Sequence, residues 1–376
     1  MRLRQLKLQH FKNYTSLSLA ITSDLVCIVG LNGAGKTNLL DAIHYLTFTK
    51  SAFANSDAMN IQKEAGFFMV KGDWEEEEKP VEVVCYQEKG QKKIIKRNKV
   101  AYEKLSDHIG QILAVMSTPY DTEIIRDSGE VRRKWIDGCI AQYDPDYLDN
   151  LLHYQRQLKQ RNALLKQYEG RLPSSALTLL DMYDESIVRL SRQISESRAR
   201  FLEEFRPHFT ANLEALVEGH EHCYIDFKSQ VLDADFEKTY RGCREKDLIN
   251  QRTTMGCHRD DFLFKLEDDP IKRFGSQGQQ KSFLIALKLA QYDHLSHKTG
   301  RLPVLLLDDI FDKLDDERIM RLLHLLTDDS KTEKGRAARG QVFITDARME
   351  RTQSLTKNLP QTQLVEIKDG NLANHD

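Results

Sequence analysis

The stretch that decides the fold is Gly30-Leu31-Asn32-Gly33-Ala34-Gly35-Lys36-Thr37. It fits the phosphate-loop pattern G-x-x-x-x-G-K-[ST] at every fixed position. An apolar run over residues 25–29 precedes it, and the helical pattern that follows has Leu39, Leu40, Ile43 and Leu46 on one face. Because glycines let successive backbone N–H groups face phosphate oxygens at a helix start, the sequence predicts a nucleotide-binding strand–loop–helix unit.

Each polar side chain of this loop has an expected task. Lys36 is expected to reach the terminal phosphates of ATP, and the Thr37 hydroxyl is expected to occupy a Mg²⁺ position. A tight turn between a strand and a helix, without a ligand, is the structural alternative. We assign the nucleotide contacts to Gly30, Leu31, Asn32, Gly33, Ala34, Gly35, Lys36, Thr37 and Asn38.

A second site follows the apolar run over residues 304–307, which ends in Asp308 and Asp309. A buried strand ending in paired carboxylates is typical of a Walker B site. Asp308 is expected to hold Mg²⁺ through water, opposite Thr37. Asp309 is expected to orient or deprotonate the attacking water, so these two aspartates are the candidate catalytic residues. A strand that ends in an Asp-Asp capping turn is the alternative.

Residues 274–282 open a helix shortly before that strand. Ser276 is a good N-cap, and Gly278 permits a close backbone approach. The order and spacing resemble the signature motif of ABC-type ATPases, which in one subunit closes on the γ-phosphate held by the other. The resemblance implies an ATP-dependent head-to-head homodimer. The residues acting in trans would be Ser276, Gln277, Gly278 and Gln279.

Two further positions follow from the same resemblance. Asp315 stands where the family has the acid of its D-loop. The strand over residues 342–345 precedes the switch position, where many relatives carry histidine but this chain carries Asp346. Thr345 or Asp346 would therefore have to sense the γ-phosphate. The lid glutamine of the family has no clear counterpart, and the candidate region is 119–123.

The predicted fold class is α/β, an ABC-type ATPase head in two lobes. Lobe I, residues 1–120 and 300–376, combines β-rich segments with a parallel α/β sheet. Lobe II, residues 121–299, is helical and contains residues 274–282. Apolar residues at 4,3 spacing on both sides of a break at 170–175 predict an antiparallel helical hairpin over 143–216. The charged segment 328–340 is expected to be a surface loop.

Several blocks of the sequence resemble the RecF family in particular, beyond the motifs that ABC-type ATPases share. They are the opening at 3–14 and the segments 115–121, 132–137 and 253–261. Cys257 and Asp346 depart from the family's usual residues. The resemblance implies binding to duplex DNA near single-strand gaps, ATP-driven dimerisation, partnership with RecR and RecO in loading RecA, and slow hydrolysis that resets the dimer.

The formal net charge of −2 means that DNA must meet a local basic surface. The candidates are Lys92, Lys93, Lys96, Arg97, Lys99, Arg132, Arg133 and Lys134. Such side chains neutralise phosphates without reading sequence, although solvated charged faces have the same composition. No segment is apolar enough to span a membrane, and the six cysteines show no metal spacing, so we expect a cytoplasmic protein with reduced thiols.

Three other functions stay open. An SMC-like structural protein would insert far more heptad sequence between Thr37 and Ser276. An ABC transporter subunit would need a surface for membrane domains, which the basic segments do not suggest. A DNA-binding adaptor could use ATP only as a conformational switch. Because the Asp309 side chain is one methylene shorter than the glutamate of most ABC-type heads, we expect a weak ATPase that duplex DNA stimulates.

Overall fold

The computed structural model describes residues 1–168, 173–217, 222–313, 316–327, 340–357, 359 and 362–373. The chain forms two compact units. Unit 1 consists of Met1–Asp121, Ala211–Gly219 and Lys281–Asp376, and unit 2 consists of Thr122–Thr210 and His220–Gln280. Ala211–Gly219 and residues 281–299 thus belong to unit 1, whereas our sequence prediction placed both segments in lobe II.

Unit 1 contains an antiparallel sheet with the strand order β2-β1-β4-β5-β6-β7. Its strands alternate between buried and more exposed side chains, as a sheet with one face on the core requires. The bounds are β1 (Arg2–Phe11), β2 (Tyr14–Ala20), β4 (Phe67–Glu76), β5 (Lys79–Glu88), β6 (Ile94–Arg97) and β7 (Val100–Ala101).

The second sheet of unit 1 has the order β15-β14-β3-β13-β12-β8, and neighbours from β14 to β8 pair in parallel. Its strands β3, β8, β12 and β13 are buried at every residue, which is usual for a parallel sheet covered on both faces. The bounds are β3 (Leu25–Val29), β8 (Ala114–Ser117), β12 (Val304–Leu307), β13 (Val342–Asp346), β14 (Thr362–Lys368) and β15 (Asn371–Leu372).

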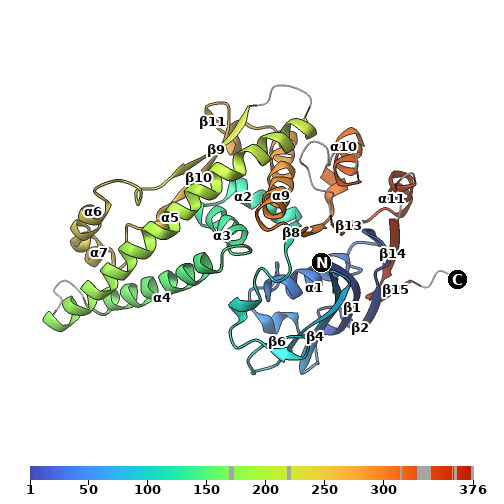
Figure 1. Cartoon of the computed structure of the whole chain (residues 1–376), viewed down its shortest axis with the longest axis horizontal. Coiled ribbons are helices and arrows are strands. Elements are labelled where there is room, and N and C mark those ends of the chain that lie inside the picture. The colour runs from blue at the N-terminus through green and yellow to red at the C-terminus, as the bar shows by residue number, and fades with distance from the viewer. Residues whose placement is uncertain are drawn as a thin grey trace. The chain divides into compact units, whose positions relative to one another are not determined.

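Helix α1 (Lys36–Phe48) contacts strands of both sheets and joins them into one hydrophobic core (Figure 1). Leu39, Leu40, Ile43 and Leu46 are fully buried, as their helical spacing predicts. The other helices described in unit 1 are α10 (Asp316–Thr327), α11 (Met349–Thr356), most of α9 (Gln277–Thr299) and the end of α5 (Ser174–Leu216). Short 3₁₀ turns lie at Asp57–Asn60, Leu105–His108, Pro119–Asp121 and Ile310–Lys313.

Unit 2 is mainly helical, and α4 (Pro145–Gln167) runs beside α5 (Ser174–Leu216) in Figure 1. These two helices span the interval in which we expected a hairpin, and residues 169–172 of the break lie outside the described residues. The remaining elements are α2 (Thr122–Arg126), α3 (Gly129–Ile140), β9 (Cys223–Lys228), α6 (Phe236–Gly242), α7 (Arg244–Asn250), β10 (Asp261–Leu266), β11 (Asp269–Pro270), α8 (Ile271–Phe274) and a 3₁₀ turn, Cys257–Arg259.

Two buried arginines form ion pairs that connect the helices of unit 2. Arg161 of α4 pairs with Asp184 of α5 at 2.6 Å and with Asp247 at 2.8 Å. Arg198 of α5 pairs with Asp260 at 2.9 Å and also donates to the carbonyl oxygen of Cys257 at 2.7 Å. A buried charge is tolerated only when it is paired, so the segment 253–261 helps to hold α5 in place. No helix in the described part of the chain is long and apolar enough to cross a membrane.

Candidate nucleotide site

The loop after β3 requires glycine at two positions where the chain bends sharply. Gly35 has a φ of 116°, and a Cβ there would lie 2.8 Å from the Tyr14 hydroxyl oxygen. A Cβ on Gly30 would collide with the carbonyl oxygen of Ile367. Neither position can accept a side chain without displacing its neighbours, because the loop passes close to other backbone and to buried side chains. The predicted strand–loop–helix unit is thus present, with α1 beginning at Lys36.

The Lys36 side chain folds back over the loop. Its ammonium donates to the carbonyl oxygens of Gly30 at 2.8 Å and Leu31 at 3.1 Å, and the residue is only 5% exposed. The charge is therefore held above the backbone that opens helix α1. Positive charge and free N–H groups at a helix start together favour an anion.

Three polar side chains from separate elements meet beside this loop. The Thr37 hydroxyl lies 3.0 Å from both carboxylate oxygens of Asp308, at the end of β12. The Thr345 hydroxyl, on β13, donates to Asp308 Oδ1 at 2.8 Å. Because β3, β13 and β12 are parallel neighbours, their carboxyl ends bring these residues to one edge of the sheet.

Burial shifts the acidity of this cluster. It raises the pKa of the Asp308 carboxyl above the usual range for aspartate, while the hydrogen bonds from Thr345 and Thr37 act in the opposite direction. A cation at this place would favour the ionised carboxylate. The hydroxyl and carboxylate oxygens are also the hard ligands that Mg²⁺ prefers, so the chemistry of the donor set fits that ion.

Asp309 adopts a left-handed backbone conformation, with a φ of 46°. Its N–H donates to the Thr345 hydroxyl oxygen at 2.8 Å, so Thr345 contacts both consecutive aspartates. Asp346, the other candidate at the switch position, is buried and accepts a hydrogen bond from Thr352 of α11 at 2.8 Å. Of the two candidates, Thr345 is the one bonded to the Asp308 carboxylate and to the Asp309 backbone, whereas Asp346 is bonded to α11.

The turn between β1 and β2 braces the phosphate loop, and our sequence analysis gave Tyr14 no role in it. The buried Tyr14 hydroxyl donates to the carbonyl oxygen of Gly35 at 2.9 Å. The Asn13 amide donates to the carbonyl oxygen of Ala34 at 3.1 Å and accepts from the Asn38 amide at 2.8 Å. The sequence carried no signal for this contact, because Tyr14 begins the strand after the turn and its partner Gly35 lies 21 residues further along the chain.

Tyr14→Phe is expected to weaken ATP binding roughly three- to tenfold, since one neutral hydrogen bond contributes about 0.5–1.5 kcal/mol. Titration with a fluorescent ATP analogue measures the affinity. Tyr86→Phe, in β5, is the matched control and should bind like the unaltered protein. Equal affinities for the two variants would show that the hydroxyl does not position the loop.

The start of α9 is closed by a reciprocal pair of hydrogen bonds. Gln279 N–H donates to the Ser276 hydroxyl oxygen at 3.2 Å, and Ser276 N–H donates to Gln279 Oε1 at 2.8 Å. This is a capping box, which confirms Ser276 as the N-cap. Ser276 and Gln277 are exposed, and Gly278 and Gln279 are partly so. Asp315, the expected D-loop acid, lies outside the described residues.

Several expected DNA contacts are instead bound to protein groups. Lys93 pairs with Asp57 at 2.8 Å, and Arg97 pairs with Glu76 at 2.6 Å. The predicted cluster 132–134 is also largely engaged, because Arg132 forms two hydrogen bonds to Asp261, at 2.9 and 3.1 Å. These side chains stabilise local structure, so we withdraw them as phosphate contacts.

The other members of the basic clusters differ in their surroundings. Arg133 donates to the carbonyl oxygen of Asp260 at 2.5 Å, and burial lowers its pKa, so it too is withdrawn. Lys134 is 74% exposed but pairs with Glu130 one helical turn away. Lys92, Lys96 and Lys99 are exposed on or beside the β6–β7 hairpin, and they remain candidates.

A phosphate loop, paired aspartates on a neighbouring parallel strand and a flanking antiparallel sheet together define an ATP-binding head of the ABC and SMC type. Comparison with known proteins narrows this class. The family model described as RecF/RecN/SMC N terminal domain matches residues 2–362. The DNA replication and repair protein RecF of Cytophaga hutchinsonii is 43% identical over 363 residues, which is 95% of this chain and 93% of that protein.

The RecF protein of Flavobacterium johnsoniae is 40% identical, over 97% of this chain and 99% of that one. The chain therefore belongs to the RecF family of DNA replication and repair proteins. A solved structure of the recombination mediator protein RecF with ATP, in the RecFOR pathway, is similar with a TM-score of 0.85 at 25% identity, over 100% of this chain and 98% of that chain. An Smc head domain from Pyrococcus furiosus shares only the fold, with a TM-score of 0.54 at 17% identity, over 99% and 95% of the two chains.

Proposed function

We propose that this chain is an ATP-dependent DNA-binding protein of recombinational repair, in which ATP joins two copies into a clamp on duplex DNA near single-strand gaps. The observation that carries the proposal is the convergence of Lys36, Thr37 and Asp308 at the loop after β3. These side chains supply a cation, a hydroxyl and a carboxylate around one phosphate-binding helix start. Similarity to RecF bound to ATP supports the same function.

Within this site, Gly30–Asn38 would bind the phosphates of ATP. Thr37 and Asp308 would hold Mg²⁺, which supplies positive charge to the phosphate oxygens when it is bound. Asp309 would orient the attacking water, and Thr345 would hold the two aspartates in position. The N–H groups and hydroxyl at Ser276, with Gln277, Gly278 and Gln279, would contact the γ-phosphate held by a second subunit. Gln279 would then have to release its bond to Ser276 as the dimer closes.

DNA would meet the exposed lysines of the β6–β7 hairpin, Lys92, Lys96 and Lys99. Partnership with RecR and RecO in loading RecA is proposed from the family and from the RecFOR pathway of the similar structures. A protein that acts on chromosomal DNA in bacteria would work in the cytoplasm. Hydrolysis would be slow and would serve to reset the clamp. An adaptor that never hydrolyses ATP is the second candidate, favoured by the short Asp309 side chain.

The test is a titration of gapped, duplex and single-stranded DNA with ATP and with ADP, across several salt concentrations. We expect tighter binding to gapped and duplex DNA with ATP than with ADP. ATP turnover measured on the same samples should be weak and rise with duplex DNA. Undetectable turnover would favour the adaptor, whereas fast turnover without DNA would contradict the switch. Equal DNA affinity in ATP and ADP would contradict the clamp.

Lys96→Glu with Lys99→Glu is expected to weaken binding to every duplex sequence and to reduce the salt dependence of log K by about two, since each phosphate contact contributes roughly 0.9. Fluorescence anisotropy with ATP present measures both quantities. The control, Lys63→Glu with Lys368→Glu, reverses as many exposed charges elsewhere in unit 1 and should leave the salt slope unchanged. Equal slopes in the two double variants would exclude the hairpin as a DNA contact.

A further inference from the structure

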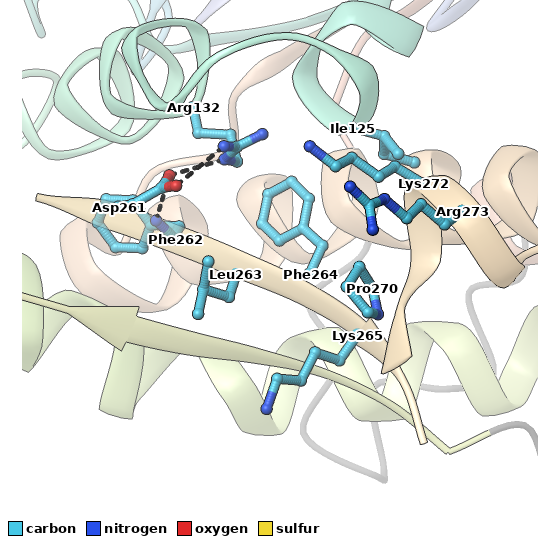
Figure 2. A pocket seen from close by; sticks show the side chains of 10 residues that line it. All are labelled: Ile125, Arg132, Asp261, Phe262, Leu263, Phe264, Lys265, Pro270, Lys272 and Arg273. Atoms are coloured by element: carbon cyan, nitrogen blue, oxygen red, sulfur yellow. Dashed lines mark hydrogen bonds and ion pairs between the residues drawn. The ribbon is translucent and has the colours of Figure 1, made fainter. Parts of the chain in front are cut away.

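Unit 2 contains a cavity of about 330 Å³ whose lining includes no residue of the phosphate loop, the paired aspartates or the signature segment 274–282. Figure 2 shows it beside strand β10, with α2 and α3 on one side and α8 on the other. Its size is at the lower end of the roughly 300–1,000 Å³ that ligand pockets occupy, so it has room for one or two side chains. All its lining residues come from unit 2, so the cavity is formed by that unit alone.

The wall of the cavity is apolar, with charges that are already neutralised. Ile125, Phe264 and Pro270 supply carbon surface. The Arg132 guanidinium lies 6.0 Å from the centre of the Phe264 ring, and its charge is taken up by Asp261. Asp261 in turn has both carboxylate oxygens bonded to Arg132, so it repels an incoming anion only weakly.

The rim of the cavity carries two positively charged side chains whose surroundings differ from those of Arg132. Lys272 and Arg273 lie on the short helix α8, and both are exposed. Within the described residues, neither has a carboxylate in salt-bridge range. Figure 2 shows both side chains extending from α8 toward the cavity and Phe264. Two uncompensated positive charges therefore flank a concave apolar wall, an arrangement that matches a ligand with an apolar group beside carboxylates.

We propose that this pocket docks an acidic segment of a protein partner. One large apolar side chain of the segment fills the cavity, and its neighbouring carboxylates pair with Lys272 and Arg273. Arginine binds carboxylate through two parallel hydrogen bonds, which gives such docking a direction as well as affinity. The residue that follows α8 and Gly275 is Ser276, so a docked partner contacts the chain immediately before the N-cap of α9.

A nucleic-acid strand fits this pocket less well. Bases bind single-strand sites mainly by stacking on aromatic faces. Phe264, the aromatic side chain in the middle of the wall, is only 6% exposed and has Arg132 over its ring. The cations that could follow a phosphate backbone are reduced to the pair on α8, because Lys265 pairs with Asp226 at 3.0 Å.

The test uses a displayed library of random twelve-residue peptides, selected on the full-length protein. The selected peptides are then synthesised with a fluorescein label and titrated by anisotropy. A labelled single-stranded oligonucleotide of thymidines is titrated in parallel. The test variant is Lys272→Glu with Arg273→Glu. The control variant is Lys238→Glu with Lys246→Glu, which reverses two exposed lysines on α6 and α7 of the same unit.

We expect the selected peptides to be acidic with a large apolar residue, and to bind about tenfold or more weakly to the test variant than to the control. Leu263→Trp, which enlarges a half-exposed side chain of the wall, should also weaken them. The proposal is overturned if no acidic peptide is enriched, if the test and control variants bind the peptides equally, or if only the oligonucleotide responds to the charge reversal on α8.

Discussion

Lys36→Met is expected to remove ATP-dependent dimerisation. A hydrogen bond from a charged group contributes about 1.5–3 kcal/mol, so ATP affinity should fall roughly 10- to 100-fold. The Lys36 ammonium is held at the phosphate loop by the carbonyl oxygens of Gly30 and Leu31, and the residue is almost fully buried. Methionine keeps much of the length and apolar stem of lysine but carries no charge, so it isolates the electrostatic contribution.

Light scattering with and without ATP measures the dimer, and a fluorescent ATP analogue measures binding. Lys63→Met is the matched control, because Lys63 is exposed and lies outside the loop. Thermal unfolding of both variants checks that the loss does not come from an unfolded loop. If Lys36→Met still forms the dimer at ATP concentrations that saturate the unaltered protein, ATP does not join the subunits through this loop.

The sequence was sufficient to predict the elements whose signals are local. The loop at Gly30–Thr37 lies between a continuous apolar strand and an amphipathic helix, so both its neighbours and its backbone conformation follow from adjacent residues. Asp308 and Asp309 likewise follow a short apolar run, which is typical of a buried strand. The contact between Asp308 and Thr37 follows from the parallel order of the strands, which the resemblance to the family implied.

The contacts that could not be predicted from the sequence join residues that are far apart in the chain. A cluster of lysines and arginines looks the same whether its charges face solvent or meet carboxylates elsewhere. Arg132 pairs with Asp261, which lies 129 residues further along the chain. The hydrogen bond from Tyr14, at the start of β2, to Gly35 was missed for the same reason. Such pairing depends on tertiary structure, so basic composition overstated the surface available to DNA.

The sequence prediction placed residues 281–299 in the wrong unit for a similar reason. Helix α9 runs from Gln277 to Thr299 without interruption, and no glycine or proline after Gly278 marks a boundary within it. Its first residues belong to unit 2, and its later residues pack in unit 1, where Lys288 pairs with Asp121 at 3.1 Å. Because the helix is continuous, the sequence contains no turn or loop signal that marks the boundary between the two units.

Ser276→Arg is expected to leave ATP binding by the monomer within about twofold of normal while abolishing dimer closure. Ser276 is exposed, so arginine can be accommodated without disturbing a core. The change removes the hydroxyl that caps α9, at a cost of about 0.5–2 kcal/mol, and places a long side chain where the second subunit's γ-phosphate would enter. Binding is measured at protein concentrations below those that support the dimer, and closure is measured by light scattering.

Two further variants, Ser276→Asn and Ser175→Arg, show whether failed closure comes from the lost serine hydroxyl or from the added arginine. Asparagine keeps the N-cap, so that variant should retain a stable α9 and reveals what the hydroxyl itself contributes to closure. Ser175→Arg places the same charge in the exposed first turn of α5 and should dimerise normally. If Ser276→Arg closes normally with ATP, this helix start is not half of the composite site. If instead the isolated monomer loses ATP, Ser276 belongs to the site of its own subunit, and the two half-sites are not exchanged between copies.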